Sequence, residues 1–275
     1  MNGRVVSPRL PLRQLAPGID LWRRGSNGGI IQVEDGGLLI DTGSDATAAA
    51  ALLAEVQNRR WRHVVIVNTH HHHDHVAGNA LLVERAGAVV WSPGSPVDAS
   101  LWPVLGSLEV MAVPGHTSDS LAVRTGSVLW VGDAVYAPEV RRRYPIPAYE
   151  DVAVALDSLR RIARWLAGDD IAWLVAGHGR PLTRSDAAAV IAENQQGVEG
   201  ALAVLARCWR SPLDRELTLR WLEAAGASPP ANERLVLYWQ RVASAYAREL
   251  VRRGRISADE AGLAGYNSTT GETSN

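Results

Sequence analysis

Apolar residues in the first two thirds of the chain occur mainly in short runs that turn-forming residues separate. Runs of this length, rich in Val, Ile and Leu and bounded by Gly, Pro or Asp, are typical of buried strands. The runs at 28–33 and 38–40 flank Asp35-Gly36-Gly37, which predicts a hairpin with positive φ at the glycines. Further strands are predicted at residues 63–68, 88–91 and 173–176, and β-rich stretches at 108–113 and 121–131.

Other segments have helical periodicity. Between residues 149 and 166, apolar side chains recur every three or four positions and form one apolar stripe. From residue 185 onward the pattern is helical, with breaks at Pro212 and at Pro229-Pro230. The predicted helices cover residues 45–59, 78–86, 149–166, 185–205, 214–225 and 232–253. These patterns predict a strand-rich α/β part at 1–184, a helical extension at 185–265 and a disordered polar tail at 266–275.

Composition and charge narrow the class of protein. The 275 residues, 47% hydrophobic and 21% charged, are typical of a globular protein with one large domain and a small appendage. A net charge of −1 gives no reason to expect a nucleic-acid or membrane partner. The chain has no apolar segment of ~20 residues and no signal-peptide pattern, so a cytoplasmic location is expected. The single Cys208 excludes an intramolecular disulfide and a cysteine-rich zinc site.

One motif carries most of the chemical information. His70-x-His72-x-Asp74-His75 directly follows the predicted strand at 63–68. Alternate residues of an extended chain point the same way, so His70 and His72 are expected to bind one metal ion. Asp74 and His75, at the following turn, are then free to face a second metal ion. An expression tag or a metal-sequestering tract would be the alternatives, but the internal position and the interposed Asp74 argue against both.

Three more candidate ligands lie in similar settings. His116 follows Pro114-Gly115, Asp133 follows Gly132, and His178 stands between Gly177 and Gly179. Each comes directly after a predicted strand, where glycine allows the backbone to approach a metal ion closely. A lone histidine beside a glycine is weak evidence of a ligand. Three such positions after the motif are stronger evidence.

The order of these ligands resembles that of the metallo-β-lactamase superfamily, which includes hydroxyacylglutathione hydrolases, lactonases and RNase Z-type nucleases. The resemblance covers about residues 18 to 182, and Asp41 matches the structural aspartate of the family. It implies an αββα sandwich of two mixed sheets, with helices outside and metal ions at one edge. It also implies two divalent ions, zinc foremost, with manganese or iron as alternatives. The implied ligands are His70, His72 and His116 for one ion, Asp74, His75 and His178 for the other, and Asp133 between them.

The resemblance also implies a reaction. Two ions ~3.5–4 Å apart share a water molecule, lower its pKa and polarise a carbonyl or phosphoryl oxygen. Asp74 is then expected to orient the hydroxide and to carry a proton to the leaving group. His71 and His73 match no ligand position, and His63 is interpreted as structural or exposed. The expected enzyme is a hydrolase that acts on an ester, thioester or lactone carbonyl of a small-molecule substrate.

Departures from the family patterns bear on the substrate. Asp133 argues against a true β-lactamase, and Gly179 replaces the Glu that ends the Cys-Gly-His-Glu sequence usual in hydroxyacylglutathione hydrolases. Tyr136 has the spacing of a tyrosine that hydrogen-bonds the substrate carbonyl in acyl-homoserine-lactone lactonases. Its alternative interpretation is a core aromatic residue. A loop at residues 141–147, with three arginines, is expected beside the metal ions, either to hold an anionic group or as a solvated charge run.

Other functions remain open. A persulfide dioxygenase on the same scaffold would hold one Fe(II) with His70, His116 and Asp133. A phosphodiesterase or nuclease is disfavoured because the chain lacks a wide basic surface and an inserted domain. A metal-stabilised binding protein is the third alternative. The C-terminal helices are expected to pack on the sandwich, where some of their apolar surface could wall the pocket or form a homodimer contact.

Overall fold

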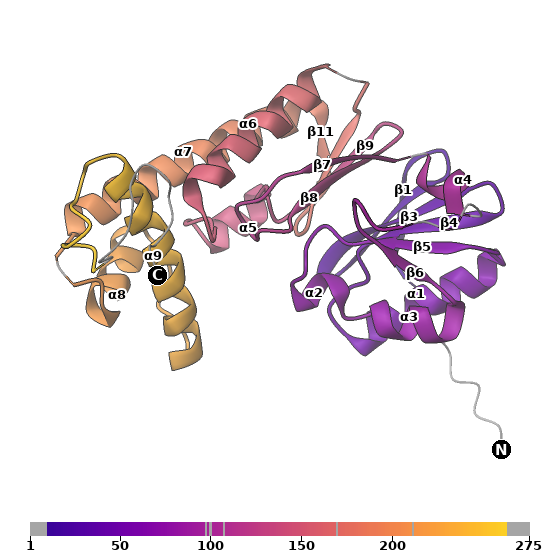
Figure 1. The fold of residues 1–275 in the computed structure, drawn as a ribbon, viewed down its shortest axis with the longest axis horizontal. Helices are drawn as coiled ribbons and strands as arrows, with labels where there is room; N and C mark the ends of the chain where they lie inside the picture. Colours follow the sequence, from indigo (N-terminus) through magenta and orange to yellow (C-terminus); the bar gives the residue numbers. More distant parts are fainter. Residues whose placement is uncertain are drawn as a thin grey trace.

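Two mixed β-sheets face each other and carry helices on their outer faces (Figure 1). The structure is a computed structural model and describes residues 10–96, 98, 101–106, 108–168, 170–210 and 212–262. The predicted αββα sandwich with a helical C-terminal extension is therefore confirmed. The predicted tail at 266–275 lies outside the described residues.

The first sheet has six strands in sequence order. Its first four strands pair antiparallel, and the last two add in parallel. The two strands nearest the N-terminus were not predicted, and the others lie close to their predicted positions. The strands are β1 (Leu12–Ala16), β2 (Ile19–Arg24), β3 (Ser26–Val33), β4 (Gly36–Ile40), β5 (Val64–Val67) and β6 (Val89–Trp91).

The second sheet has the order β11-β10-β9-β8-β7, with β9 and β10 parallel. The β-rich stretch predicted at 121–131 forms the two strands of a hairpin, because the chain reverses at Gly126, whose φ is 55°. Glycine adopts this conformation without steric cost. The strands are β7 (Leu108–Ala112), β8 (Leu121–Thr125), β9 (Val128–Gly132), β10 (Trp173–Ala176) and β11 (Leu182–Thr183).

Three apolar layers hold the sandwich together. Inward-facing strand residues such as Leu38 and Trp130 form a core between the two sheets. Helices α1 (Ala46–Arg59) and α3 (Asn79–Ala86) cover the first sheet, where Leu52 packs in one cluster with strand residues. Helices α6 (Val152–Gly168) and α7 (Arg184–Cys208) cover the second sheet. These helices lie close to the predicted segments.

The C-terminal helices form a fourth core with the loop that precedes α6. Helices α8 (Arg215–Ala224) and α9 (Glu233–Arg252) pack beside the end of α7, at the left in Figure 1. Trp221 is fully buried there, and the Tyr246 hydroxyl donates a hydrogen bond to the Pro147 carbonyl at 2.9 Å. Because α7 packs both on the second sheet and against α8 and α9, the predicted boundary at residue 184 stays a prediction.

Two local predictions are wrong. In the β3–β4 turn the positive φ belongs to Glu34, at 46°, and not to the glycines. A Cβ on Gly37 would instead collide with the ring of Trp61, so close approach explains the glycine. The arginines at 141–143 do not form a loop but end the helix α5 (Pro138–Arg143), where the helix dipole favours cations.

Short helices α2 (His73–Val76) and α4 (Trp102–Leu105) complete the described elements. Cys208, in the last turn of α7, is partly buried and has a free thiol. Within the described residues, every helix is too short or too polar to cross a membrane.

Candidate metal centre

The predicted ligands meet at one edge of the sandwich. β4 and β5 are parallel, as are β9 and β10, and the carboxyl ends of parallel neighbours lie at the same edge of a sheet. Asp41 follows β4, the motif from His70 follows β5, Asp133 follows β9, and His178 follows β10. His116 comes from the loop between β7 and β8. The topology therefore gathers residues that are up to 137 positions apart (178 minus 41) in the sequence.

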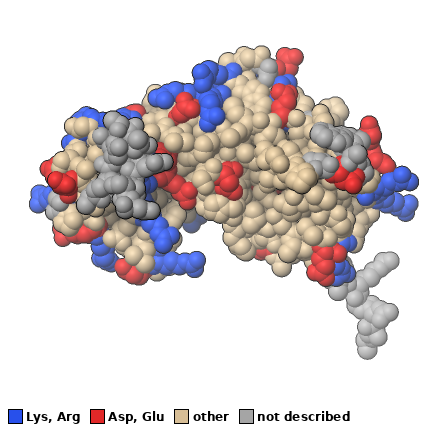
Figure 2. Space-filling model, in the orientation of Figure 1, with Lys and Arg blue, Asp and Glu red and all other residues tan. Residues whose placement is uncertain are grey.

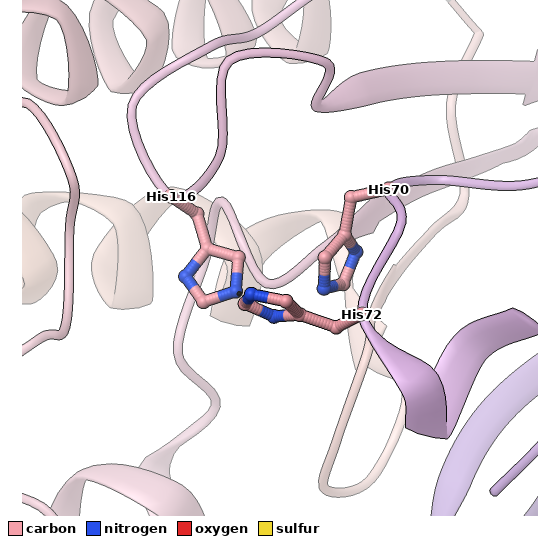
Figure 3. A group of neighbouring side chains, drawn as sticks. All are labelled: His70, His72 and His116. Atoms are coloured by element: carbon pink, nitrogen blue, oxygen red, sulfur yellow. Dashed lines mark hydrogen bonds between the residues drawn. The ribbon is translucent and has the colours of Figure 1, made fainter. Parts of the chain in front are cut away.

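His70, His72 and His116 form the three-histidine group. Each offers one ring nitrogen, and these nitrogens lie within 4.8 Å of one another. Figure 3 shows the three rings turned toward one another, with His72 Nδ1 3.0 Å from His116 Nε2. His70 is 2% exposed and His116 5% exposed, whereas His72 is partly exposed.

Asp74, His75 and His178 form a second group, the Asp74 group, with donor atoms again within 4.8 Å of one another. Asp74 Oδ2 lies 3.1 Å from His178 Nε2 and 3.7 Å from His75 Nε2. The Asp133 carboxylate lies between the two groups. Its Oδ2 is 3.7 Å from His116 Nε2 and 3.6 Å from His178 Nε2.

Hydrogen bonds to the outer ring nitrogens orient four of the five histidines. His75 Nδ1 contacts Asp41 Oδ2 at 2.8 Å, His116 Nδ1 contacts the Ala148 carbonyl at 2.9 Å, and His178 Nδ1 contacts the Gly25 carbonyl at 2.9 Å. These oxygens accept hydrogen bonds, so each Nδ1 carries a proton and each Nε2 faces the centre. Such partners fix both the tautomer and the orientation of metal-binding histidines.

Asp41 orients rings in both groups. It is buried, adopts a left-handed φ of 57°, and accepts hydrogen bonds from the Thr69 amide at 2.7 Å and the Thr69 hydroxyl at 2.8 Å. Because that hydroxyl donates to Asp41, it accepts from His70 Nδ1, 3.1 Å away. The same carboxylate bonds His75 directly. One buried side chain thus aligns a ring of each group.

The turn between β2 and β3 supports the Asp74 group, and the sequence did not point to it. Ser26 Oγ donates to the Asp74 carbonyl at 2.6 Å, and Asn27 Nδ2 donates to the Gly179 carbonyl at 2.8 Å. The Gly25 carbonyl accepts a hydrogen bond from His178 Nδ1. A Gly-Ser-Asn turn is common in proteins, and only the packing of this turn against β10 gives these residues their role.

Burial and neighbouring charges together shift the pKa values of the ligands. Burial and the neighbouring histidines lower the pKa of His70 far below its ordinary value. Burial also lowers the pKa of His75, but the carboxylates of Asp41 and Asp133 outweigh it and raise that pKa to about 9. Burial raises the pKa of Asp74, and its hydrogen bond to His178 with nearby histidine charges lowers it well below the ordinary value.

The donor set fits divalent metal ions. The Nε2 atoms of His70 and His75 are buried without a hydrogen-bond partner, which is costly unless another group binds them. Neutral imidazoles with carboxylates are the ligands that zinc and similar divalent ions prefer in proteins. The predicted ligand assignments remain predictions, but the structure brings all seven side chains together.

The other predicted residues lie around this centre. His71 is outside it, with Nδ1 2.8 Å from exposed Asp119, whereas His73 lines the adjoining cavity. The Tyr136 hydroxyl accepts from the Ala148 amide at 3.1 Å and donates to the Ala148 carbonyl at 3.2 Å. The predicted bond from Tyr136 to a substrate is untested.

A cavity of about 830 Å³ opens beside the ligands. Its floor contains Asp74, Asp133 and His178, and its walls come from α5, the residues that follow it, and α9. Of the three arginines in α5, Arg143 reaches the cavity, whereas Arg141 pairs with Glu193 at 2.6 Å. The wall is largely apolar and aromatic: Val140, Tyr144, Ile146, Leu235, Tyr238 and Trp239.

Comparisons with known proteins agree with this geometry. A family model of the metallo-β-lactamase superfamily matches residues 21–112, the segment that contains the motif. Over this segment the chain is similar to the metallo-β-lactamase superfamily. No curated protein sequence matches the chain significantly.

Solved structures share the fold. TMB-1 is 18% identical, with 68% of this chain and 98% of that chain covered and a TM-score of 0.52. The DIM-1 metallo-β-lactamase is also 18% identical, with 70% and 99% covered and a TM-score of 0.52. A metallo-β-lactamase from Erythrobacter litoralis is 20% identical, with 66% and 96% covered and a TM-score of 0.51. At these identities the likeness concerns the fold alone.

Proposed function

We propose that the protein is a dinuclear metal-dependent hydrolase of esters, thioesters or lactones. The observation that carries the proposal is the position of Asp133, within 3.6–3.7 Å of one histidine from each ligand group. His70, His72 and His116 would hold one ion, and Asp74, His75 and His178 the other. Zinc is the expected metal. Two divalent ions in such a site lower the pKa of a water molecule and polarise a carbonyl oxygen.

Asp74 has the position for proton handling. It lines the cavity and is partly exposed, with Oδ2 beside His178. Its lowered pKa suits a hydrogen-bond acceptor that orients the attacking water more than it suits a strong base. As the new carbon–oxygen bond forms and the bond to the leaving group breaks, the water proton would pass by way of Asp74 to the leaving oxygen or sulfur.

The wall of the cavity supports an acyl substrate. An apolar and aromatic surface next to the candidate centre suits a hydrocarbon part of a substrate, which gains free energy when it leaves water. On the face shown in Figure 2, acidic side chains are interspersed with the basic ones, and a continuous basic band is absent from its described residues.

Metal analysis and a substrate panel test the proposal. Untagged protein is expected to hold close to two zinc ions per chain and to hydrolyse at least one ester, thioester or lactone. A phosphodiester and a β-lactam belong in the panel as contrasts. One iron ion, no zinc, and oxygen consumption with a persulfide would instead favour the dioxygenase alternative.

Asp74→Asn sharpens the test. The amide keeps the shape of the side chain but removes its charge, so turnover is expected to fall by at least ~10²-fold, in the range that general acid–base groups contribute. The three-histidine group should keep its metal ion. His71→Gln, a change outside both ligand groups, serves as the control. Near-parental kcat with full metal content would show that the assignment of Asp74 is wrong.

A further inference from the structure

Helix α9 brings a second phenol to the candidate metal centre. Tyr238 lines the 830 Å³ cavity together with Asp133 and Tyr136. It also lines a neighbouring cavity of about 360 Å³ that His72 and His116 share. A side chain that borders both cavities stands where they meet beside the three-histidine group.

The hydroxyl groups of Tyr136 and Tyr238 differ in their partners. The Tyr136 hydroxyl is buried and hydrogen-bonds the amide and the carbonyl of Ala148. The same carbonyl also accepts a hydrogen bond from His116 Nδ1. Within the part of the chain that the structure describes, the Tyr238 hydroxyl has no hydrogen-bond partner. Tyr238 as a whole is 41% exposed. A substrate oxygen could therefore reach Tyr238 without breaking a protein hydrogen bond, whereas Tyr136 would first have to release Ala148.

We propose that Tyr238, and not Tyr136, donates the hydrogen bond that stabilises the carbonyl oxygen of the substrate as negative charge builds on it. This inference rests on the proposed hydrolase function and deepens it. When the attacking oxygen bonds to the carbonyl carbon, the π electrons move to the carbonyl oxygen. The Tyr238 hydroxyl donates a hydrogen bond to that oxygen and keeps its proton. Tyr136 then acts as a positioning residue that holds Ala148 against His116.

The surroundings of Tyr238 suit a donor. Partial burial and the nearby Asp133 carboxylate raise the pKa of Tyr238 to about 12, so the phenol stays protonated through the neutral range. Its ring contacts Trp239, with centroids 5.6 Å apart, and Trp239 is itself part of the cavity wall. An apolar acyl group on this wall would lie in the cavity that Tyr238 shares with Asp74 and Asp133.

A binding experiment tests the donor without turnover. Hexylphosphonate has an apolar chain and a tetrahedral anion, which imitates the charged state of an ester under attack. Its dissociation constant for zinc-loaded, full-length protein can be measured by calorimetry for the parent, Tyr238→Phe, Tyr136→Phe and Tyr246→Phe. Tyr246 lies on the same helix, with its hydroxyl bonded to Pro147 and away from both cavities, and is the matched control.

Tyr238→Phe is expected to weaken hexylphosphonate binding roughly tenfold, as the loss of a hydrogen bond to a charged group does. Tyr246→Phe should stay within about twofold of the parent, the spread of such comparisons. Tyr136→Phe, which loosens Ala148 beside His116, should weaken binding less than Tyr238→Phe does. With a hydrolysed ester, Tyr238→Phe should lower kcat by roughly 10–10²-fold, less than a fully enclosed donor, and change KM little.

Equal dissociation constants for the parent and Tyr238→Phe would overturn the inference. A larger effect of Tyr136→Phe, or failure of the parent to bind hexylphosphonate, would overturn it as well. The protein could also bind hexylphosphonate through Tyr238 and yet hydrolyse no ester, thioester or lactone. This result would support Tyr238 as the hydrogen-bond donor and would overturn only the proposal that the protein is a hydrolase.

Discussion

The ligand edge of the sandwich and the cavity wall opposite it are built in different ways. On the ligand edge, His70, His75 and His116 are at most 5% exposed, and hydrogen bonds fix their rings. On the wall, Leu235 and Tyr238 of α9 are 40% and 41% exposed. The edge is a rigid set of donors, whereas these wall side chains form an accessible surface.

This difference suggests that the ligand edge binds metal ions and that the wall binds the substrate. Side chains with fixed rotamers suit metal binding, because ligands must keep their geometry to within a fraction of an ångström. Exposed side chains on a helix can change without disturbing those ligands. The ligand edge should therefore tolerate few substitutions, and the wall should accept many. Three predictions test this comparison.

Asp41→Asn is expected to have the largest effect, because Asp41 aligns rings in both ligand groups. Asparagine tolerates the left-handed backbone at this position, so the change acts mainly through hydrogen bonding. Metal affinity should fall by roughly 10–100-fold, the usual range for partners of metal ligands. Competition with a chelator measures it.

Asp45→Asn is the control for Asp41→Asn. Asp45 caps α1 by accepting a hydrogen bond from the Ala48 amide at 2.7 Å, and asparagine caps helices equally well. Its metal affinity should match that of the parent. An Asp41→Asn protein with parental metal affinity would mean that the ligand edge does not depend on this carboxylate.

Leu235→Ala is expected to have an intermediate effect, confined to substrate choice. Leu235 lines the cavity, and removing three carbons from an apolar wall costs up to ~0.8 kcal/mol for each methylene contact that is lost. If the protein is an esterase, the preference for a hexanoyl over an acetyl ester, measured as kcat/KM, should fall by roughly 3–10-fold.

Leu237→Ala provides the comparison for Leu235→Ala. Leu237 is on the same helix and 54% exposed, but it does not line the cavity. Leu237→Ala should leave the preference for the hexanoyl ester unchanged. If both variants behave alike, α9 does not form the substrate wall, and the comparison between edge and wall fails.

The smallest effect on stability is expected from the ion pair between Arg252 of α9 and Asp151, which precedes α6. Arg252 donates to both Asp151 oxygens at 3.1 Å. Burial raises the pKa of Asp151, and the Arg252 guanidinium outweighs it, so the pKa lies below the ordinary value. Such a carboxylate stabilises the folded state above its unfolded pKa of about 4 and loses this contribution as the pH falls toward its folded pKa.

Asp151→Asn should therefore unfold more easily than the parent at pH 7, by at most ~1 kcal/mol because both side chains are partly exposed. The difference should shrink between pH 5 and pH 3, as urea denaturation would show. Asp157→Asn, which removes an exposed pair with Arg161, is the control. A difference that persists at pH 3 would exclude the ion pair as its cause.

The sequence predicted most strands, the helices and the ligand candidates because these depend on local order, whereas the sandwich was implied by the resemblance to a known superfamily. A strand that ends in His70-x-His72-x-Asp74-His75 places four donors in one small volume whatever the rest of the chain does. Glycine before His116, Asp133 and His178 marked sharp turns after strands in the same way. Helix boundaries were close because caps and apolar stripes are properties of neighbouring residues.

Tertiary structure alone decided which groups surround those ligands. Tyr136 was predicted to bind the substrate because it lies three residues after Asp133, yet its hydroxyl hydrogen-bonds the backbone of Ala148. Tyr238 lies more than 100 positions further on, and no local pattern links a residue of α9 to β9. The partner of a phenol depends on how distant segments pack, and a one-dimensional pattern holds no distances between them. The sequence therefore showed the ligands and allowed the C-terminal helices to wall the pocket, but it did not show which residues of α9 line the cavity.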